Sequence, residues 1–343
     1  MKKDKNNNTV KISFVIPVFN SQGYLRKCVD SILIQGGREI EIILINDGST
    51  DNSGKICDEY CSKFNFIKVV HKENEGVAIA RNIGIEKSVG NYVFFVDNDD
   101  WVAEGSVRSI ISIINKKEVD LIINKYYIVN KEKIGLGNFL INKKKINNQE
   151  VDRVLGYFRK NRINIMAPWK YVVRRDIIVR NNIFFNSSQN GVDDSVFSSI
   201  LFCHCRSFYL NDYPTYYWRQ ITSSQGRNHD KNNFMKKIFS TFYSFSEFLE
   251  KSSDENKKRY IYFCIYKNIF SLFQFYKYYS QSEKNEIRFF LIKNKKIIRK
   301  SSRNSGPVHF LLFNLLGSFY GMLLGYNFAK IKGIFHRFIF KLK

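Results

Sequence analysis

The sequence lacks the cysteine patterns of metal-binding and disulfide-rich proteins. No two of its six cysteines form a C-x-x-C pair, and their spacing fits no zinc site. Residues 1–9 are polar and run directly into an apolar stretch, so no signal peptide is predicted. These absences exclude a small secreted scaffold and predict reduced structural thiols in a cytoplasmic protein. The cysteines are Cys28, Cys57, Cys61, Cys203, Cys205 and Cys264.

Acidic residues are scarce in the last third of the chain, and none follows Glu286. From Lys231 onward there are 22 Lys and Arg residues against 6 Asp and Glu residues, which places +16 of the formal charge of +24 in this region. Such an excess predicts an anionic partner, either a membrane or a nucleic acid. Basic and aromatic residues alternate over 257–277, but no nucleic-acid-binding motif accompanies them, so no nucleic acid is expected.

The rest of the sequence is that of a globular protein with alternating strands and helices. Hydrophobic residues make up 44% of the 343 residues and aromatic residues 16%. Apolar runs predict five strands, and residues with helical spacing predict the helices between them. The strands are expected at 11–17, 39–46, 67–71, 92–96 and 120–129, with helices near 25–33, 56–64, 77–86 and 106–114.

This alternation predicts an α/β domain with a parallel sheet covered on both faces. Right-handed crossovers bring the carboxyl ends of parallel strands to one edge of the sheet. Residues 17–20, 47–51 and 97–100 are therefore expected to line a single crevice, where open α/β sheets bind their ligands.

The stretch 91–101, NYVFFVDNDDW, has the most specific chemistry in the sequence. An apolar strand runs directly into Asp97 and Asp99, and two carboxylates two residues apart in a turn can bind one divalent cation. A diphosphate is the natural ligand of such an ion. The alternative is an acidic turn that caps the next helix.

Four blocks in this order resemble the family 2 glycosyltransferases, an inverting group with the GT-A fold. They are VIPVFN (15–20), INDGSTD (45–51), ENEGVAIARNIGI (73–85) and FVDNDDW (95–101). The resemblance covers residues 13–101 closely and the next hundred more loosely. It implies a GT-A (Rossmann-like), mostly parallel sheet sandwiched by helices.

The resemblance also implies residues that bind the nucleotide sugar. Asp47 would bond the base, and the alternative is that it caps the following turn. Arg81 would contact the base or the phosphates, and the alternative is a surface salt bridge to Glu86 or Glu75. Asp99, with Asp97, would hold Mg²⁺ or Mn²⁺. The remaining nucleotide-sugar contacts would come from Pro17, Val18, Phe19, Asn20, Asp97 and Asn98.

An inverting transfer needs a base for the acceptor hydroxyl. Asp193 and Asp194 match the acidic pair of the family, with Asp193 in place of the usual Glu, and Asp194 is the candidate base. The alternative is that one of the pair caps the helix that follows. The candidate acceptor or phosphate contacts are Trp101, Trp169, Lys170 and Arg219, and core packing accounts for Trp169 almost as well.

The predicted organisation has four parts. A polar tail (1–10) precedes the GT-A domain (11–225), with a nucleotide-sugar half (11–130) and an acceptor half (131–225). A helical subdomain (226–303) and an apolar and basic tail (304–343) follow. Residues 304–329 carry no Asp, Glu, Lys or Arg. Basic residues on both flanks favour a helix lying in the membrane plane over a spanning helix or a buried helix.

The sequence therefore predicts a metal-dependent inverting glycosyltransferase at the cytoplasmic face of the cell membrane, held there as a peripheral or monotopic protein. Its partners would be a nucleotide-sugar donor, expected to be a UDP-sugar, a glycan or undecaprenyl-linked acceptor, and an anionic membrane surface. The setting would be synthesis of capsule, lipopolysaccharide or exopolysaccharide. One rival is a sugar nucleotidyltransferase, although 17–23 lacks the glycine-rich loop of that class. Another is a basic nucleic-acid- or membrane-binding protein without catalysis.

Overall fold

The computed structural model describes residues 10–130, 133–137, 145–146, 166–186, 193–220, 231–275 and 278–303. It divides into two compact units, Met1–Asn228 and His229–Lys343. The bounds of the four parts expected from the sequence stay a prediction. The strands are β1 (Ile12–Val18), β2 (Ile40–Asp47), β3 (Ile67–Lys72), β4 (Tyr92–Phe95), β5 (Trp101–Val102), β6 (Leu121–Asn130), β7 (Lys133–Gly137), β8 (Lys145–Ile146), β9 (Tyr171–Arg174) and β10 (Phe208–Arg219).

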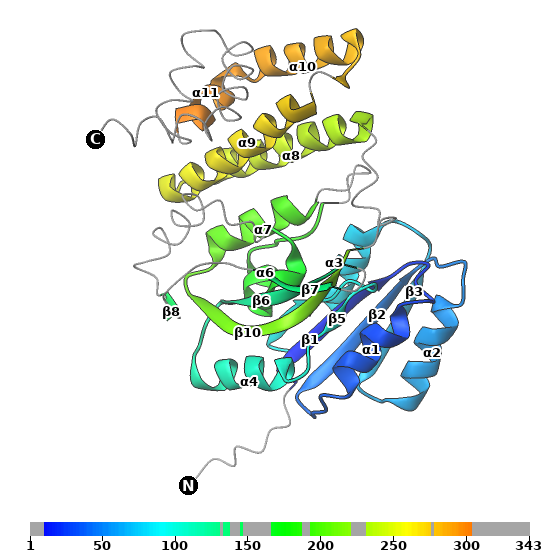
Figure 1. Cartoon of the computed structure of the whole chain (residues 1–343). Coiled ribbons are helices and arrows are strands. Elements are labelled where there is room, and N and C mark those ends of the chain that lie inside the picture. The colour runs from blue at the N-terminus through cyan, green and yellow to red at the C-terminus, as the bar shows by residue number, and fades with distance from the viewer. Residues whose placement is uncertain are drawn as a thin grey trace. The chain divides into compact units, whose positions relative to one another are not determined.

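The helices of the first unit connect these strands, and those of the second unit follow one another along the chain (Figure 1). The first unit contains α1 (Leu25–Leu33), α2 (Ser53–Lys63), α3 (Val77–Lys87), α4 (Ser106–Lys116), α6 (Arg175–Arg180), α7 (Asp193–His204) and the 3₁₀ turn η2 (Pro168–Lys170). The second contains α8 (Lys231–Lys251), α9 (Glu255–Phe275), α10 (Gln281–Lys293) and α11 (Lys295–Arg303).

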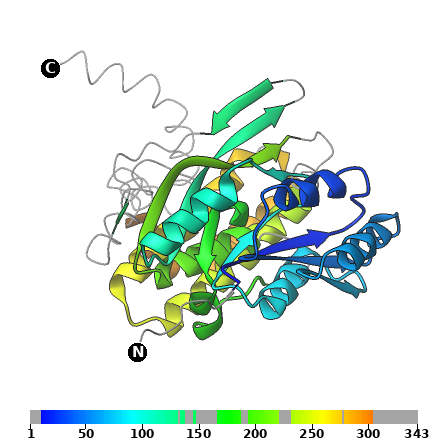
Figure 2. The same cartoon turned by 90° about the horizontal axis from the view of Figure 1, so that it is seen from below.

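The first unit is built on one mixed sheet with the order β3-β2-β1-β4-β9-β6-β10-β5. Strands β3, β2, β1 and β4 are parallel, as the alternating sequence pattern predicts. The predicted fifth strand, β6, does not lie beside β4, because β9 is inserted antiparallel between them. Strands β5 and β7 add further antiparallel pairs, and Figure 2 shows β6 and β7 side by side. The α/β class is confirmed, and the antiparallel strands are an addition to the prediction.

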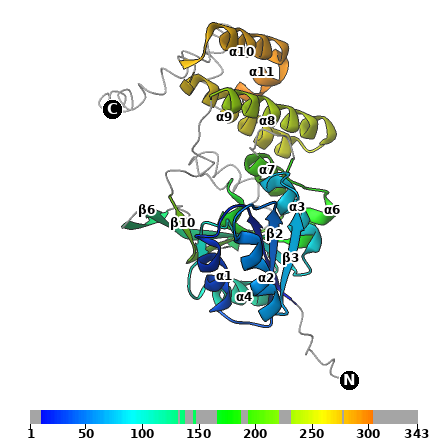
Figure 3. The same cartoon turned by 90° about the vertical axis from the view of Figure 1, so that its right-hand side faces the viewer.

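Helices cover both faces of this sheet (Figure 3). One face packs on α1, α2 and α4 through alternate residues of β1, including Phe14 and Ile16. On the other face Phe95 packs edge-on against Phe185 and against Phe197 of α7. Every residue of β1, β2 and β4 is buried, which explains why these strands are rich in apolar residues.

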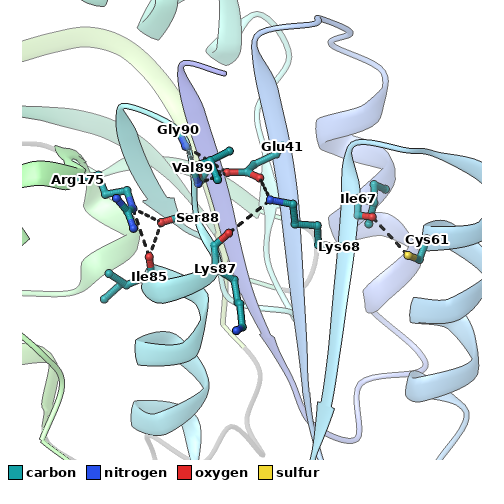
Figure 4. A network of polar contacts seen from close by, with 11 residues as sticks. Glu41, Cys61, Ile67, Lys68, Ile85, Lys87, Ser88, Val89, Gly90 and Arg175 are labelled. Carbon is teal, nitrogen blue, oxygen red and sulfur yellow. Dashed lines mark hydrogen bonds and ion pairs between the residues drawn. The ribbon is translucent and has the colours of Figure 1, made fainter. Parts of the chain in front are cut away.

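The amino-terminal edge of the sheet is closed by a buried carboxylate, Glu41 (Figure 4). Glu41 accepts hydrogen bonds from Ser13 Oγ (2.6 Å) and from the N–H groups of Val89 (2.6 Å) and Gly90 (3.2 Å). Lys68 Nζ lies 2.8 Å from its other oxygen. Burial opposes ionisation, but Lys68, Ser13 and Val89 outweigh it and hold the pKa of Glu41 below its ordinary value. This network joins β1, β2, β3 and the turn before β4 at the edge opposite the predicted crevice.

The second unit is a set of helices with its own apolar core. Phe239 and Phe290 stack with ring centroids 4.0 Å apart, and Phe242 meets Phe290 edge-on. Helix α10 begins with a capping box formed by Ser280 and Glu283. The helices predicted before residue 304 are therefore confirmed. No helix in the described ranges combines the length and the apolar character needed to cross a bilayer. The predicted tail, 304–343, lies outside the described residues.

Candidate active site

The turn after β4 carries three aspartates and is held by the end of β10. The N–H of Asp97 donates to Tyr216 Oη (3.0 Å), and the Tyr216 hydroxyl donates to Asp100 Oδ2 (2.8 Å). The N–H of Arg219 donates to Asp100 Oδ1 (2.7 Å). Burial, followed by the charges of Asp97 and Asp99, raises the pKa of Asp100. Asp100 is therefore a structural member of the turn, bonded to β10 through both of its oxygens.

Asp99 has the surroundings of a cation ligand. Burial raises its pKa to about 6, and the charge of Asp97 adds to this shift. A cation beside the two carboxylates would relieve their repulsion. Among the described residues, no group of three or more His, Cys, Asp and Glu side chains could hold a metal ion by itself. Two neighbouring carboxylates fit an ion such as Mg²⁺, which binds one or two carboxylates and completes its shell with phosphate oxygens and water.

Arg81 of α3 connects the end of β4 with the start of α7. Its Nη2 lies 2.9 Å from Asp97 Oδ1, and its Nη1 lies 2.6 Å from Asp194 Oδ1. The guanidinium is buried and packs 5.2 Å from the centre of the Phe185 ring. Burial opposes the charge of Arg81, but Asp194 and Asp97 outweigh it and raise its pKa, so it stays protonated. The alternative salt bridge does not form: Glu75 pairs with Lys72, and Glu86 with Lys87.

The predicted acidic pair opens α7. Asp193 is the first residue of this helix and Asp194 the second. The side chain of Asp193 lies outside the described residues. The Asp194 carboxylate is partly exposed, and its ion pair with Arg81 joins positions 113 residues apart. The predicted base is thereby linked, through one side chain, to the predicted metal-binding turn.

The end of β1 contacts both the β4 turn and the turn that follows β2. Asn98 Nδ2 donates to the carbonyl of Pro17 (2.9 Å), and Val18 is fully buried. Asn20 has a left-handed backbone (φ 44°), and its side-chain oxygen accepts from the N–H of Thr50 (2.8 Å). Its own N–H donates to Ser49 Oγ (3.1 Å). Phe19 lies between these positions and is partly exposed.

Asp47, at the end of β2, is buried and bonded to the loop that precedes α3. Its Oδ1 accepts from Lys72 Nζ (2.7 Å) and from the N–H of Glu75 (3.0 Å), and its Oδ2 accepts from the N–H of Gly76 (2.9 Å). The next residue, Gly48, has φ 70°, and a Cβ there would lie 2.7 Å from the N atom of Asn74. Asp47 thus orders this loop, and its role toward a base stays a prediction.

Trp101 lies beside the aspartate turn in an aromatic and cationic group. It stacks on Tyr217 with centroids 5.0 Å apart, and Lys27 Nζ lies 3.4 Å from the centre of its ring. The Arg219 guanidinium lies 4.9 Å from the ring centres of Trp101 and Tyr24. Arg219 Nε also donates to the carbonyl of Asp99 (2.9 Å). Two cations next to the D-x-D turn are suited to an anionic ligand.

Trp169 and Lys170 occupy a different environment. Trp169 is buried, stacked on Tyr216 (4.8 Å) and on Trp218 (5.8 Å). Core packing, the alternative reading of Trp169, accounts for this position. Burial lowers the pKa of Lys170 to about 8, and its Nζ lies 5.0 Å from the centre of the Tyr126 ring. A role in acceptor binding stays a prediction for both residues.

Several residues of this region were not singled out by their sequence pattern. Lys27 lies on α1, and a lysine on an amphipathic helix is ordinarily interpreted as a solvent-exposed surface residue. Tyr216 belongs to β10, a strand that the alternating pattern does not reveal. Phe185 follows no motif. Only the packing of separate segments brings these side chains to the aspartates.

The chain is similar to known glycosyltransferases. Residues 13–175 match the sequence profile described as Glycosyl transferase family 2. Glycosyltransferase GlyG of Streptococcus pneumoniae is 30% identical over 240 residues, 67% of this chain and 78% of GlyG. Glycosyltransferase GlyA of the same organism is 43% identical over 120 residues, and that match spans 35% of this chain and 17% of GlyA.

The fold has a solved counterpart. The crystal structure of S. aureus TarS 1-349 in complex with UDP-GlcNAc superposes with a TM-score of 0.74 at 17% identity, covering 94% of this chain and 92% of that one. At this identity the likeness concerns the fold, which is GT-A as the four sequence blocks predict. The identity to GlyG over most of its length, together with the family match, shows that this chain is a glycosyltransferase of family 2.

Proposed function

We propose that this chain transfers one sugar, a hexose or an N-acetylhexosamine, from a nucleoside diphosphate sugar to a glycan acceptor with inversion at the anomeric carbon. The observation that carries the proposal is Arg81, which pairs with the D-x-D residue Asp97 and with Asp194 at once. These two contacts support a base and a diphosphate site close to each other, as a displacement on a nucleotide sugar requires.

The donor we propose is a UDP-sugar. TarS, which shares the fold, was crystallised with UDP-GlcNAc and with UDP. The end of β1, with Pro17 and Asn20, and the end of β2, with Asp47, would receive the nucleoside. Lys27 lies over the ring of Trp101 and Arg219 contacts the carbonyl of Asp99, and both cations would bind the diphosphate.

In the reaction, Asp194 takes the proton of the acceptor hydroxyl as that oxygen bonds to the anomeric carbon. The bond from that carbon to the donor phosphate oxygen breaks, and the nucleoside diphosphate leaves with the electron pair. Arg81 holds the Asp194 carboxylate in position. Asp99, with Asp97, would hold Mg²⁺ or Mn²⁺, which neutralises charge on the leaving diphosphate when bound.

The acceptor we propose is a growing or lipid-linked glycan in the synthesis of a surface polysaccharide such as capsule, lipopolysaccharide or exopolysaccharide. The basic last third of the chain and the uncharged stretch 304–329 support a site of action at an anionic membrane surface. A peripheral or monotopic position on the cytoplasmic face follows from that proposal, with an undecaprenyl-linked glycan as the acceptor.

The test is donor hydrolysis or transfer by the purified protein against a panel of nucleotide sugars, with Mn²⁺ and with EDTA. Wild type is compared with Asp99→Ala, Asp194→Asn and the control Glu59→Gln, which changes an exposed ion pair with Arg26 on α1. Turnover of one donor only with metal, lost in both aspartate variants and kept in the control, is expected. Turnover that persists with EDTA and in Asp99→Ala would refute the metal assignment. Turnover that persists in Asp194→Asn would refute the assignment of Asp194 as the base.

A further inference from the structure

Helix α10 has apolar residues on two opposite faces. Ile287, Phe290 and Leu291 are buried in the core of the second unit. On the other side, Phe289 is 68% exposed and Ile292 is 58% exposed. At 100° per residue these two side chains lie about 60° apart on the helix surface, so they form one exposed patch. The core therefore accounts for only half of the apolar surface of this helix.

Cations flank the exposed pair on α10. Arg288 and Lys293 lie on the same side of α10 and are exposed, as are Lys295 and Lys296 at the start of α11. The chain has 12 Lys and Arg residues from 287 to 343 and no Asp or Glu. Two bulky apolar side chains flanked by cations, which outnumber the single carboxylate Glu286 on this side of α10, combine the two features that bind a protein to the interface of an anionic bilayer.

We propose that this α10 face, made of Arg288, Phe289, Ile292 and Lys293, docks on an anionic lipid surface. Phe289 and Ile292 enter the boundary between headgroups and acyl chains, while the cations meet lipid phosphates. The inference deepens the proposed membrane setting by adding a surface outside the tail. It rests on that setting for its biological meaning but is tested without any donor chemistry.

Charge and chain connectivity favour lipid over other occupants of this face. A second copy would present the same cations and repel the first. The uncharged stretch 304–329 starts directly after α11, so a membrane-associated tail would hold this part of the chain near the bilayer. One weak membrane anchor gives reversible binding, and stable attachment takes two signals. The α10 face would be the second.

The experiment is co-sedimentation of the full chain with vesicles of equal parts phosphatidylglycerol and phosphatidylcholine, and with phosphatidylcholine alone. The test variant is Phe289→Ser with Ile292→Ser. The matched control is Ile34→Ser with Val89→Ser, which removes two apolar side chains of the first unit that are 73% and 61% exposed. A charge variant, Arg288→Gln with Lys293→Gln, is compared with Lys55→Gln with Lys63→Gln.

Wild type is expected to prefer anionic vesicles, and the test variant to bind them about tenfold more weakly, with the control unchanged. The charge variant should bind about fivefold more weakly, since each cation near an anionic surface contributes to binding. Equal binding by wild type and test variant would overturn the proposal, as would equal binding to neutral and anionic vesicles. A wild-type dimer that the test variant loses, seen by sedimentation velocity, would assign the face to a second copy.

Donor hydrolysis without vesicles separates this inference from the proposed function. The α10 variants lie in the second unit, away from every candidate site residue in sequence, and are expected to hydrolyse donor at the wild-type rate. An inactive wild type that still binds anionic vesicles through Phe289 and Ile292 would refute the enzymatic proposal and leave the docking face intact.

Discussion

Arg81 acts on two acidic residues that the sequence places far apart. Both of its terminal nitrogens are engaged, and its Nε is buried without a hydrogen-bond partner among the described atoms. A buried donor of this kind is costly unless a partner is supplied. The geometry fits a residue that fixes Asp194 and Asp97 relative to each other.

The first prediction concerns Arg81→Gln and Arg81→Lys. We expect kcat to fall about 100-fold in Arg81→Gln, because a displaced base loses the near-attack geometry. The kcat of Arg81→Lys should fall less, since the lysine ammonium can still reach one of the two carboxylates. Steady-state kinetics against donor concentration, with thermal unfolding alongside, gives the measurement. A large rise in donor KM with kcat preserved would instead assign Arg81 to donor binding.

Glu41 gives a second prediction, on stability. Glu41→Gln should lower the free energy of unfolding by about 2 kcal/mol at neutral pH, because the ion pair with Lys68 is lost and the acceptor of the Ser13 and Val89 hydrogen bonds is no longer charged. Urea unfolding is the measurement. Glu39→Gln, in an exposed pair with Lys11, is the control and should change little.

The pH dependence of the same variant has a definite sign. The folded pKa of Glu41 lies below its ordinary value of 4.5, so its contribution is complete above that pH and is lost as pH falls through the folded pKa. The difference between wild type and Glu41→Gln should therefore shrink below about pH 4.5. A difference that stays constant down to the acid transition would contradict the ionised network.

At the scale of elements, the position of α3 on β1 decides where Arg81 lies. A Cβ on Gly84 would come within 2.2 Å of Val15 Cγ1, so the helix can lie this close to the strand only with glycine there. Gly84 is one turn after Arg81 on the same helix. The site geometry is thus set by helix packing as well as by the strand ends.

The third prediction is that Gly84→Ala displaces α3 and lowers both stability and activity. Overpacking of this kind costs about 2 kcal/mol, and kcat should fall because the Arg81 contacts move. Gly23→Ala, where a Cβ would meet nothing within 4 Å, is the control. Val15→Ala added to Gly84→Ala should recover part of the lost kcat. No recovery in the double variant would show that the overlap with Val15 is not the cause.

In the whole molecule, most of the net positive charge and the candidate site residues lie in different units. All candidate site residues lie in Met1–Asn228, whereas +16 of the +24 charge lies from Lys231 onward. Exposed charges act over about 10 Å at 0.1 M salt, so added salt screens surface binding far more than a partly buried site.

The fourth prediction follows from this separation. Raising salt from about 0.05 to about 0.5 M, which shortens the screening length several-fold, should release the protein from anionic vesicles. Donor hydrolysis by the same preparation should change less than about twofold, because the partly buried ion pairs of Arg81 are weakly screened. Sedimentation and a hydrolysis assay across one salt series measure both. If vesicle binding and donor hydrolysis were lost together over the salt series, the separation of surface charge from the site would be contradicted.

The sequence by itself determined the strands β1 to β4, the helices between them and the edge at which Asp97 and Asp99 lie. Those features depend on local apolar runs and on the fixed hand of parallel crossovers, which are read from neighbouring residues. The roles of the site residues remain predictions. Only the tertiary structure decided that β9 separates β4 from β6, that Arg81 pairs with Asp194, that Asp47 orders a loop and that Trp169 is buried. Each of these depends on contacts between segments distant in sequence, and local patterns do not encode which distant partner a side chain meets.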